Sequence, residues 1–376
     1  MRPPVSEDPT RVVAAPAQRA HRSPSLATAT VTGRESADAA LREVLEGGVI
    51  GSALLGPGYR RLWSSLADAT QGGKRFRSAL FTAAYDAWDG DDAESAAGVG
   101  AALELLHTAF VVHDDVIDGD DVRRGRLNVS GSHVARALSA GVDAPRAREY
   151  GAAAGILAGD LALAAALRTI AFCPAPRPTV LRLFDLFDAA LQATAAGELA
   201  DVWMSLGADR AQLREILVAE ENKTAAYSFS LPLQAAAVLA RAPEPQVASV
   251  GEVGRLLGVA FQLVDDLLGV FGDPTVTGKS ALSDLRAGKQ TPVVAHARTT
   301  PVWPEVEPYV GRADLSDLQA EHARDLLTRS GSRVFVQELA DDHARAAIAS
   351  ARQAGLPSAL VAWIEALSGD LLGRCS

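Results

Sequence analysis

The chain has 376 residues, a formal net charge of −10 and only 5% aromatic residues. The acidic balance excludes general binding of nucleic acid, and abundant alanine with few aromatics favours packed helices over a sheet sandwich. The only two cysteines, Cys173 and Cys375, give no disulfide framework. This is typical of a reducing compartment and predicts a cytoplasmic location. No apolar run approaches the roughly 20 residues of a membrane span, so we expect no span and no membrane partner.

The first 35 residues are rich in proline, serine, threonine and arginine. They lack the apolar core of a secretory signal. We predict a disordered tail over residues 1–35, with an organelle transit peptide as the alternative.

From residue 36 to residue 376, apolar residues recur three and four positions apart, and Gly, Pro or polar breaks separate the segments. Strand alternation is missing, and no glycine-rich phosphate loop follows a strand. Proline clusters at 174–178, 243–245 and 301–308 indicate loops between helices rather than domain linkers. The pattern predicts one all-α domain over 36–376.

A basic group stands early in this domain, in the stretch QGGKRFRSAL. Lys74 and Arg77 are three residues apart and follow two glycines, which let a backbone approach a ligand closely. The group alone is equally compatible with a solvated basic patch.

The stretch HDDVIDGDDVRRGR, residues 113–126, holds five carboxylates and then three arginines. On a helix, Asp114 and Asp118 lie about one turn, ~6 Å, apart on one stripe. Such like charges destabilise a helix unless a cation bridges them, and Mg²⁺ prefers one or two carboxylates with waters and a substrate phosphate. A solvated acidic helix end is the alternative. An EF-hand is excluded, because with Gly119 in the glycine position Val116 and Gly125 would fall at ligand positions.

A second acidic helix segment is FQLVDDLLG, in which Gln262, Asp265 and Asp266 share a face. Lys279 and Lys289 follow in a glycine-punctuated loop. Two acidic helix ends, each followed by cations, describe a site for a diphosphate held by several metal ions.

The motifs GGKRFR, ELLHTAFVVHDDVIDGDDVRRG, AGELAD, NKTAAYS, FQLVDD and GKSALSDLRAGKQT follow in this order over residues 72–291. In order and spacing the chain resembles the trans-isoprenyl diphosphate synthases of the polyprenyl synthetase family. The resemblance implies an isoprenoid synthase fold, a single-domain bundle of long helices around a central cavity. It also implies a Mg²⁺-dependent homodimer that joins isopentenyl diphosphate to allylic diphosphates.

The resemblance further implies a role for each motif residue. Asp114 and Asp118 would bind two Mg²⁺ ions on the allylic diphosphate, and Asp265 a third. That diphosphate would be held by Lys223, Lys279 and Arg123. The isopentenyl diphosphate would be held by Lys74, Arg77, His107 and Arg124. Lys289 would be a further cation near the leaving group, and Thr224, Gln262 and carbonyls near Lys223 would supply dipoles toward an allylic cation.

Three positions depart from the family pattern: Gly269 replaces the third Asp of the second acidic motif, Glu198 stands where Gln is frequent, and Ser78 replaces a Pro. Asp273 cannot easily share the metal of Asp265, since eight residues span ~12 Å of helix. We expect activity to survive these changes.

Product length in the resembling family depends on the fourth and fifth residues before the first Asp, here Phe110 and Ala109. Ala109 leaves space that an aromatic residue often fills in enzymes stopping at fifteen carbons, whereas Phe110 argues against very long chains. We predict a C20 product, geranylgeranyl diphosphate, with C15 (farnesyl) or C25 as neighbours. Ordinary helix packing is the other interpretation of Phe110.

Two other functions compete with an elongating synthase. A terpene cyclase would carry an Asn/Ser/Glu metal motif on the second helix and would not need Lys74, Arg77 and His107. A non-catalytic regulatory subunit of a heteromeric synthase would have lost one acidic motif, a feature to which only Gly269 points.

Overall fold

The computed structural model describes residues 26–207, 210–272, 283–312 and 314–373. Almost all of them are helical, which confirms the predicted all-α class. The longer helices are α1 (Leu26–Gly51), α2 (Pro57–Ala69), α3 (Phe76–Ala87), α4 (Ala93–Ile117), α5 (Val129–Ser139), α6 (Ala144–Ala171), α7 (Arg177–Ser205), α8 (Leu213–Glu220), α9 (Leu231–Leu239), α10 (Glu244–Phe271), α15 (Asp317–Arg329), α16 (Ser332–Gln353) and α17 (Ser358–Leu372).

Shorter elements connect or extend these helices. They are the 3₁₀ turns η1 (Ser52–Leu55) and η3 (Glu307–Tyr309), the π-helix η2 (Glu221–Ser230), and the short helices α12 (Ser283–Ala287), α13 (Pro292–Ala297) and α14 (Trp303–Val306). Within the described residues, strands occur only in one antiparallel hairpin, β1 (Val122–Arg123) with β2 (Arg126–Leu127). The first helix begins at Leu26, before the predicted domain start at residue 36.

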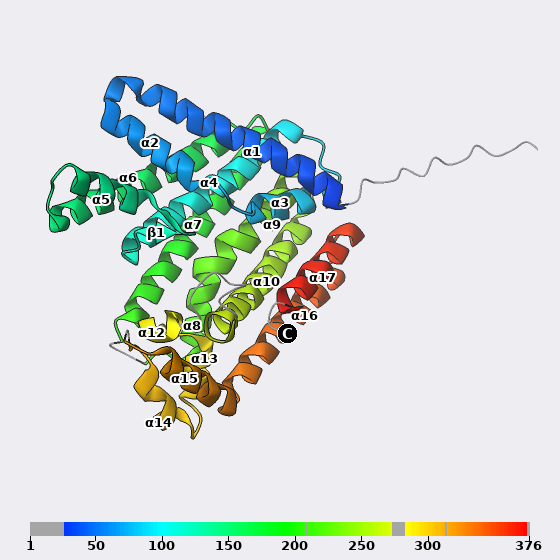
Figure 1. Cartoon of the computed structure of the whole chain (residues 1–376). Coiled ribbons are helices and arrows are strands. Elements are labelled where there is room, and N and C mark those ends of the chain that lie inside the picture. The colour runs from blue at the N-terminus through cyan, green and yellow to red at the C-terminus, as the bar shows by residue number, and fades with distance from the viewer. Residues whose placement is uncertain (1–25, 208–209, 273–282, 313, 374–376) are drawn as a thin grey trace, which may run out of the picture.

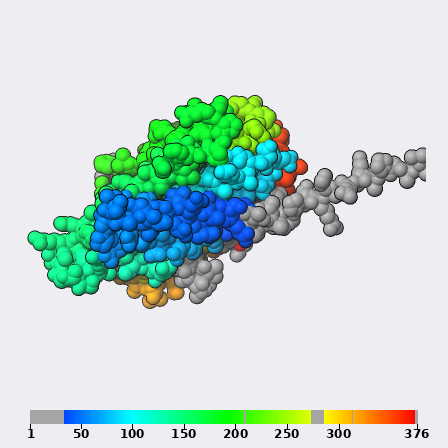
Figure 2. Space-filling model, turned by 90° about the horizontal axis from the view of Figure 1, so that it is seen from above, coloured from blue at the N-terminus to red at the C-terminus, as the bar shows by residue number. Residues whose placement is uncertain are grey.

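Helix α4 lies at the centre of the bundle and packs against α6, α1 and α3 (Figure 1). Helices α10, α16 and α17 lie on one side, and α12 to α15 gather at the lower end. Seen from above, α1 and α2 form a ridge along the molecule, with α5 at one end (Figure 2). The C-terminal residues of α4 therefore lie within reach of α6 and α7.

Small residues allow the central helices to approach closely. A Cβ added to Gly159 of α6 would lie 2.1 Å from Nε2 of His113, and one added to Gly155 would lie 2.3 Å from Val116. Neither position admits a larger side chain unless the side chain of His113 or Val116 moves away. The abundance of alanine and glycine in the sequence thus serves close helix packing.

The hydrophobic interior comprises a large cluster around α3, α4, α7 and α9 and a second cluster around α13, α15 and α16. Helix α10 contributes to both: Val253 and Leu257 pack in the first, and Leu263 and Leu267 in the second. Because α10 is one continuous helix that packs in both clusters, it connects the two parts of the bundle.

Three helices, α4, α6 and α10, are long and apolar enough to cross a membrane by length and composition alone. The expectation that no segment reaches this threshold was therefore wrong. Central position explains the hydropathy of α4, since 67% of its apolar window is buried within the protein. The corresponding share for α6 is only 44%, because part of its apolar surface faces outward.

Leu66 and Leu54 provide a matched test of this packing. Leu66 of α2 is 0% exposed, whereas Leu54 of η1 is 97% exposed. Leu66→Ala should lower the free energy of unfolding by about 2–5 kcal/mol, because it leaves a cavity. Leu54→Ala should change it by less than about 0.5 kcal/mol. Urea unfolding followed by circular dichroism measures both, and equal effects would contradict the described position of α2.

Candidate active site at the ends of helices α4, α7 and α10

The C-terminal end of α4 carries the first acidic motif. Asp118 caps the helix, and its backbone N–H donates to the Asp114 carbonyl at 2.8 Å. The two residues therefore lie one turn apart, as predicted. Burial, and next the charge of Asp114, raises the pKa of the Asp118 carboxyl. Their mutual repulsion is present in the folded protein.

The β1–β2 hairpin places an arginine side chain beside these carboxylates. Its turn places Arg124 and Gly125 in the left-handed region, at φ 54° and 72°. Arg123 then donates from Nε to Asp115 at 2.6 Å and from its terminal nitrogen to Asp114 at 3.3 Å. This tight turn brings Arg123 back to Asp115 and Asp114, which lie eight and nine residues earlier in the sequence.

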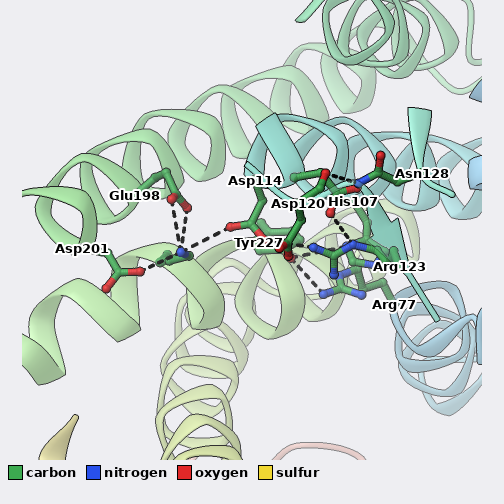
Figure 3. A network of polar contacts seen from close by, with 11 residues as sticks. Arg77, His107, Asp114, Asp120, Arg123, Asn128, Glu198, Asp201 and Tyr227 are labelled. Carbon is green, nitrogen blue, oxygen red and sulfur yellow. Dashed lines mark hydrogen bonds and ion pairs between the residues drawn. The ribbon is translucent and has the colours of Figure 1, made fainter. Parts of the chain in front are cut away.

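A second cation, Lys223, lies on the other side of Asp114. Its Nζ is 2.7 Å from Asp201, 3.0 Å from Glu198 and 3.4 Å from Asp114 (Figure 3). Burial opposes the charge of the ammonium group, but the three carboxylates outweigh it and raise the pKa of Lys223. Glu198 thus balances a lysine, and Asp201, the last residue of the AGELAD motif, is a neighbour of Lys223 that was assigned no role from the sequence.

Lys223 reaches this position from a π-helix. The apolar spacing of three and four residues is typical of an ordinary α-helix, whereas the structure inserts the ten-residue η2 between α8 and α9. A Cβ on Gly197 of α7 would lie 2.3 Å from the backbone nitrogen of Lys223, so α7 touches the wide π-turn directly. π-segments are rare and recur at functional sites. Periodicity at three and four residues could not have revealed it.

The second acidic motif, on α10, faces the same region through a hydrogen-bond chain. Thr224 Oγ1 donates to Gln262 Oε1 at 3.1 Å, and Gln262 Nε2 donates to Asp266 Oδ1 at 3.1 Å. Asp266 is 1% exposed, whereas Asp265 is exposed to solvent. Lys289 Nζ lies 3.9 Å from Asp266. Lys279 and Asp273 lie outside the described residues.

A polar cavity of about 560 Å³ opens on one side of α4. Every residue assigned from sequence to the isopentenyl diphosphate lines it: Lys74, Arg77, His107 and Arg124. Arg77 donates to Tyr227 Oη at 3.0 Å and to Ser228 Oγ at 2.7 Å. Burial and then the nearby arginines lower the pKa of His107 well below its usual value. The cavity thus combines several fixed cations with a neutral imidazole, which suits an anionic ligand.

Arg75 is a further lining residue that sequence reasoning missed. It adopts a left-handed conformation with φ 51° before α3 begins. Its guanidinium bonds Asp38 and the Thr70 carbonyl and lies 3.9 Å from buried Glu104. These contacts fix the loop that presents Lys74, and no simple sequence pattern marks such a backbone strain.

A second, largely apolar cavity of about 800 Å³ lies on the other side of α4, against α6, α7 and η2. Asp114, Glu198 and Lys223 stand in its lining beside apolar residues that include Leu163 and Leu191. Both residues assigned to product length line it as well: Ala109, which is buried, and Phe110, whose ring packs edge-on against Tyr227 at 4.8 Å. His107, Val111 and Arg123 line both cavities, so the cavities adjoin.

The carboxylates suit a cation that takes part of its coordination from elsewhere. Among the described residues, no group of three or more His, Cys, Asp or Glu side chains forms a ready-made metal cage. Asp114 and Asp118 one turn apart instead offer oxygen ligands on one side only. Mg²⁺ fits this donor set, because it retains waters and accepts phosphate oxygens.

Comparisons with known proteins agree with this geometry. The family described as Polyprenyl synthetase matches residues 61–316. A geranylgeranyl diphosphate synthase of Sulfolobus acidocaldarius is 37% identical over 60% of this chain and 63% of its own length. A (2E,6E)-farnesyl diphosphate synthase of Mycobacterium bovis is 33% identical over 80% of both chains.

A solved structure extends the likeness to the whole fold. Geranylgeranyl pyrophosphate synthase from Corynebacterium glutamicum, complexed with isoprenyl diphosphate and magnesium, superposes with a TM-score of 0.83 at 26% identity, covering 92% of this chain and 99% of that one. The bundle is therefore an isoprenoid synthase fold, as the motifs predicted. The family match, the relatives and the shared fold agree, and the chain belongs to the polyprenyl synthetase family of prenyl-transferring enzymes.

Proposed function

We propose that the protein is a Mg²⁺-dependent prenyltransferase that condenses isopentenyl diphosphate with allylic diphosphates of five, ten or fifteen carbons, with geranylgeranyl diphosphate as its main product. The observation that carries this proposal is the pair of adjoining cavities at Asp114. One is polar and lined by cations, and the other is apolar with carboxylates and Lys223 in its lining. Two diphosphates and one growing hydrocarbon chain match these surfaces.

The allylic diphosphate is proposed to bind where Asp114, Asp118 and Asp265 present carboxylates. Three Mg²⁺ ions held there would supply positive charge to the leaving diphosphate. If metal ions neutralised Asp114, its contacts with Arg123 and Lys223 would weaken. Both cations, together with Lys279 and Lys289, would then hold diphosphate oxygens. Side chains that pair with carboxylates of the protein in this structure would in this way contact the substrate.

The reaction begins when the allylic C–O bond breaks and its electron pair leaves with the diphosphate. The allylic cation lies in the apolar cavity beside Thr224, where few competing nucleophiles are present. The double bond of isopentenyl diphosphate, held by Lys74, Arg77, His107 and Arg124, attacks the cation. The departing diphosphate removes the resulting proton, so no side-chain base is needed.

The basic cavity favours elongation over the two competing functions. A terpene cyclase needs no second diphosphate site, yet Arg77 and His107 line one here. A regulatory subunit would have lost one acidic motif, yet Asp114 and Asp118 of the first motif are both present, one turn apart at the end of α4. We propose further that the protein is a single domain that acts in the cytoplasm and has neither nucleic acid nor a membrane as a partner.

An outward apolar surface on α6 and α7 supports a homodimer. Leu157 of α6, Trp203 of α7 and Leu206 at the end of α7 are between 55% and 67% exposed. Large apolar side chains exposed in this way are typical of protein interfaces. A second copy is the proposed partner.

Trp203→Glu tests the dimer, because a charge at the centre of an apolar interface opposes association. Sedimentation velocity should show a dimer for the unchanged protein and a shift toward monomer for the variant. Leu318→Glu on α15, where Leu318 is 77% exposed, is the control and should remain dimeric. A monomeric unchanged protein would refute the dimer.

Asp114→Asn tests the metal assignment. Loss of this carboxylate should lower kcat by at least about 100-fold, because metal ions contribute several kcal/mol to stabilising the leaving group. The same change should abolish the rise in thermal midpoint that Mg²⁺ with inorganic diphosphate gives the unchanged protein. Asp121→Asn, an exposed carboxylate of the same motif, is the control. Near-full turnover by the Asp114 variant would contradict the assignment.

Product size tests the role of the apolar cavity. With Mg²⁺, isopentenyl diphosphate and a C5, C10 or C15 primer, we expect the dephosphorylated product to be mainly the C20 alcohol. Phe110→Ala should lengthen the products by one or more isoprene units, because it removes a ring from the cavity lining. A main product of C15 or C25 would keep the enzyme class and overturn the argument from Ala109 and Phe110. No elongation from any primer would overturn the proposed function.

A further inference from the structure

The proposed reaction gives no role to Arg126, the third arginine of the stretch HDDVIDGDDVRRGR. Arg126 is the first residue of β2 and is exposed. It also lines the polar cavity, as do the four residues assigned to isopentenyl diphosphate. Its side chain is therefore available to a ligand in that cavity.

The hairpin holds Arg126 directly opposite another arginine. Arg123 and Arg126 are cross-strand partners, so their side chains share one face of the hairpin, with Cβ atoms about 5 Å apart. The two residues between them, Arg124 and Gly125, both have positive φ, as a type I′ turn requires. Like charges directly opposite destabilise a hairpin, and the left-handed Arg124 adds backbone strain. The turn thus holds positive charges together at a cost in stability.

Contacts with the neighbouring helices keep the hairpin in this conformation. The Asp120 N–H donates to the Asp115 carbonyl at 2.9 Å, and the Asn128 N–H donates to the Asp121 carbonyl at 3.0 Å. The Asn128 side chain also donates to the Asp120 carbonyl at 2.6 Å (Figure 3). A Cβ added to Gly131 of α5 would lie 2.1 Å from the Asp121 carbonyl oxygen, so α5 packs directly against the start of the hairpin. The position of β2 is therefore fixed by α4 and α5.

The three arginines of the hairpin differ in their partners. Arg123 pairs with Asp115 and Asp114. Within the part of the chain that the structure describes, neither Arg124 nor Arg126 has a side-chain hydrogen bond or an ion pair. Arg126 thus keeps all the N–H donors of its guanidinium for a ligand.

The charges of the polar cavity match these unpaired cations. Of the described residues that line the cavity, six are basic and three carry carboxylates, which leaves an excess of three positive charges. The basic residues are Lys74, Arg75, Arg77, Arg123, Arg124 and Arg126, and the acidic ones are Asp68, Glu104 and Asp115. A diphosphate ester carries about three negative charges near neutral pH. Lys74, like Arg124 and Arg126, has no side-chain partner among the described residues, so three unpaired cations face that charge.

We propose that Arg126 binds the diphosphate of isopentenyl diphosphate as a third unpaired cation, beside Lys74 and Arg124. This inference rests on the proposed function, which assigns that substrate to the polar cavity. Isopentenyl diphosphate keeps its diphosphate throughout the reaction, so Arg126 contacts it equally before and during the chemical step. Loss of such a contact raises KM and leaves kcat unchanged.

The test compares the full-length protein with Arg126→Gln, using Mg²⁺, isopentenyl diphosphate and geranyl diphosphate. KM for isopentenyl diphosphate should rise about 10-fold, because one charge-assisted hydrogen bond is lost. Both kcat and the KM for geranyl diphosphate should stay within about threefold. Arg126→Lys, which keeps the charge but not the planar set of donors, should raise the KM for isopentenyl diphosphate by less.

Calorimetric titration with isopentenyl diphosphate alone, without Mg²⁺, measures binding directly. The dissociation constant should rise in Arg126→Gln by the same factor as the KM. Omitting the metal ion separates this binding from that at the acidic end of the apolar cavity, which depends on metal in the proposed function.

Arg136→Gln is the matched control. Arg136 is an exposed arginine of the neighbouring α5 and is not among the described residues that line the polar cavity. The substitution removes the same charge and should leave both KM values unchanged. The thermal midpoint of Arg126→Gln without substrate should be no lower than that of the unchanged protein, because the substitution relieves repulsion with Arg123.

An unchanged KM and dissociation constant in Arg126→Gln would overturn the inference. Equal effects in Arg136→Gln would show that only the general field of the protein acts on the substrate, and a fall in kcat with a lower thermal midpoint would indicate a structural role. Either of these results would also overturn it. If the unchanged protein neither elongates a primer nor binds isopentenyl diphosphate, the proposed function itself is wrong, whatever the Arg126 variants do.

Discussion

Repulsion among carboxylates is the constraint on which the active-site end of this protein depends. Asp114, Asp115 and Asp118 crowd the C-terminal end of α4, where the helix dipole already disfavours negative charge. Glu198 and Asp201 approach from α7. The fold offsets this repulsion with two cations from separate elements, Arg123 of the hairpin and Lys223 of the π-helix. In the structure these cations pair with carboxylates of the protein, and in the proposed reaction they would exchange part of these contacts for diphosphate oxygens.

Close packing lets this arrangement exist. The ammonium group of Lys223 reaches three carboxylates because α7 touches the backbone of η2 at Gly197, and a Cβ there would force the elements apart. The glycine contacts of α6 on α4 likewise bring the wall of the apolar cavity up to Phe110 and Asp114. The chain is thus rich in small side chains and poor in aromatic ones because several helix ends must approach closely to form the site.

Much of the fold and site could be predicted from the sequence, because they depend on regular spacing. Apolar periodicity revealed the helices, and the separation of Asp114 from Asp118 revealed a shared turn. Lys74, Arg77, His107 and Arg124, which line the polar cavity, were each predicted from the motifs, whereas Arg75 was not. Features that depend on tertiary contact could not be predicted, and these include the π-register of η2 and the left-handed conformation of Arg75. It was also missed from the sequence that α4, α6 and α10 are long and apolar enough to cross a membrane, because a helix buried in a bundle and one buried in lipid can have the same composition.

The wall shared by the two cavities has a kinetic consequence. In the proposed reaction, each new chain carries the diphosphate that entered with isopentenyl diphosphate, so it is formed with its head group in the polar cavity. A further round requires this head group to pass His107 and Arg123, which line both cavities, into the acidic end of the apolar one. Elongation therefore competes with escape of the head group at the wall that these residues form. Product length then reflects a ratio of two rates, transfer and release, as well as the space below Phe110.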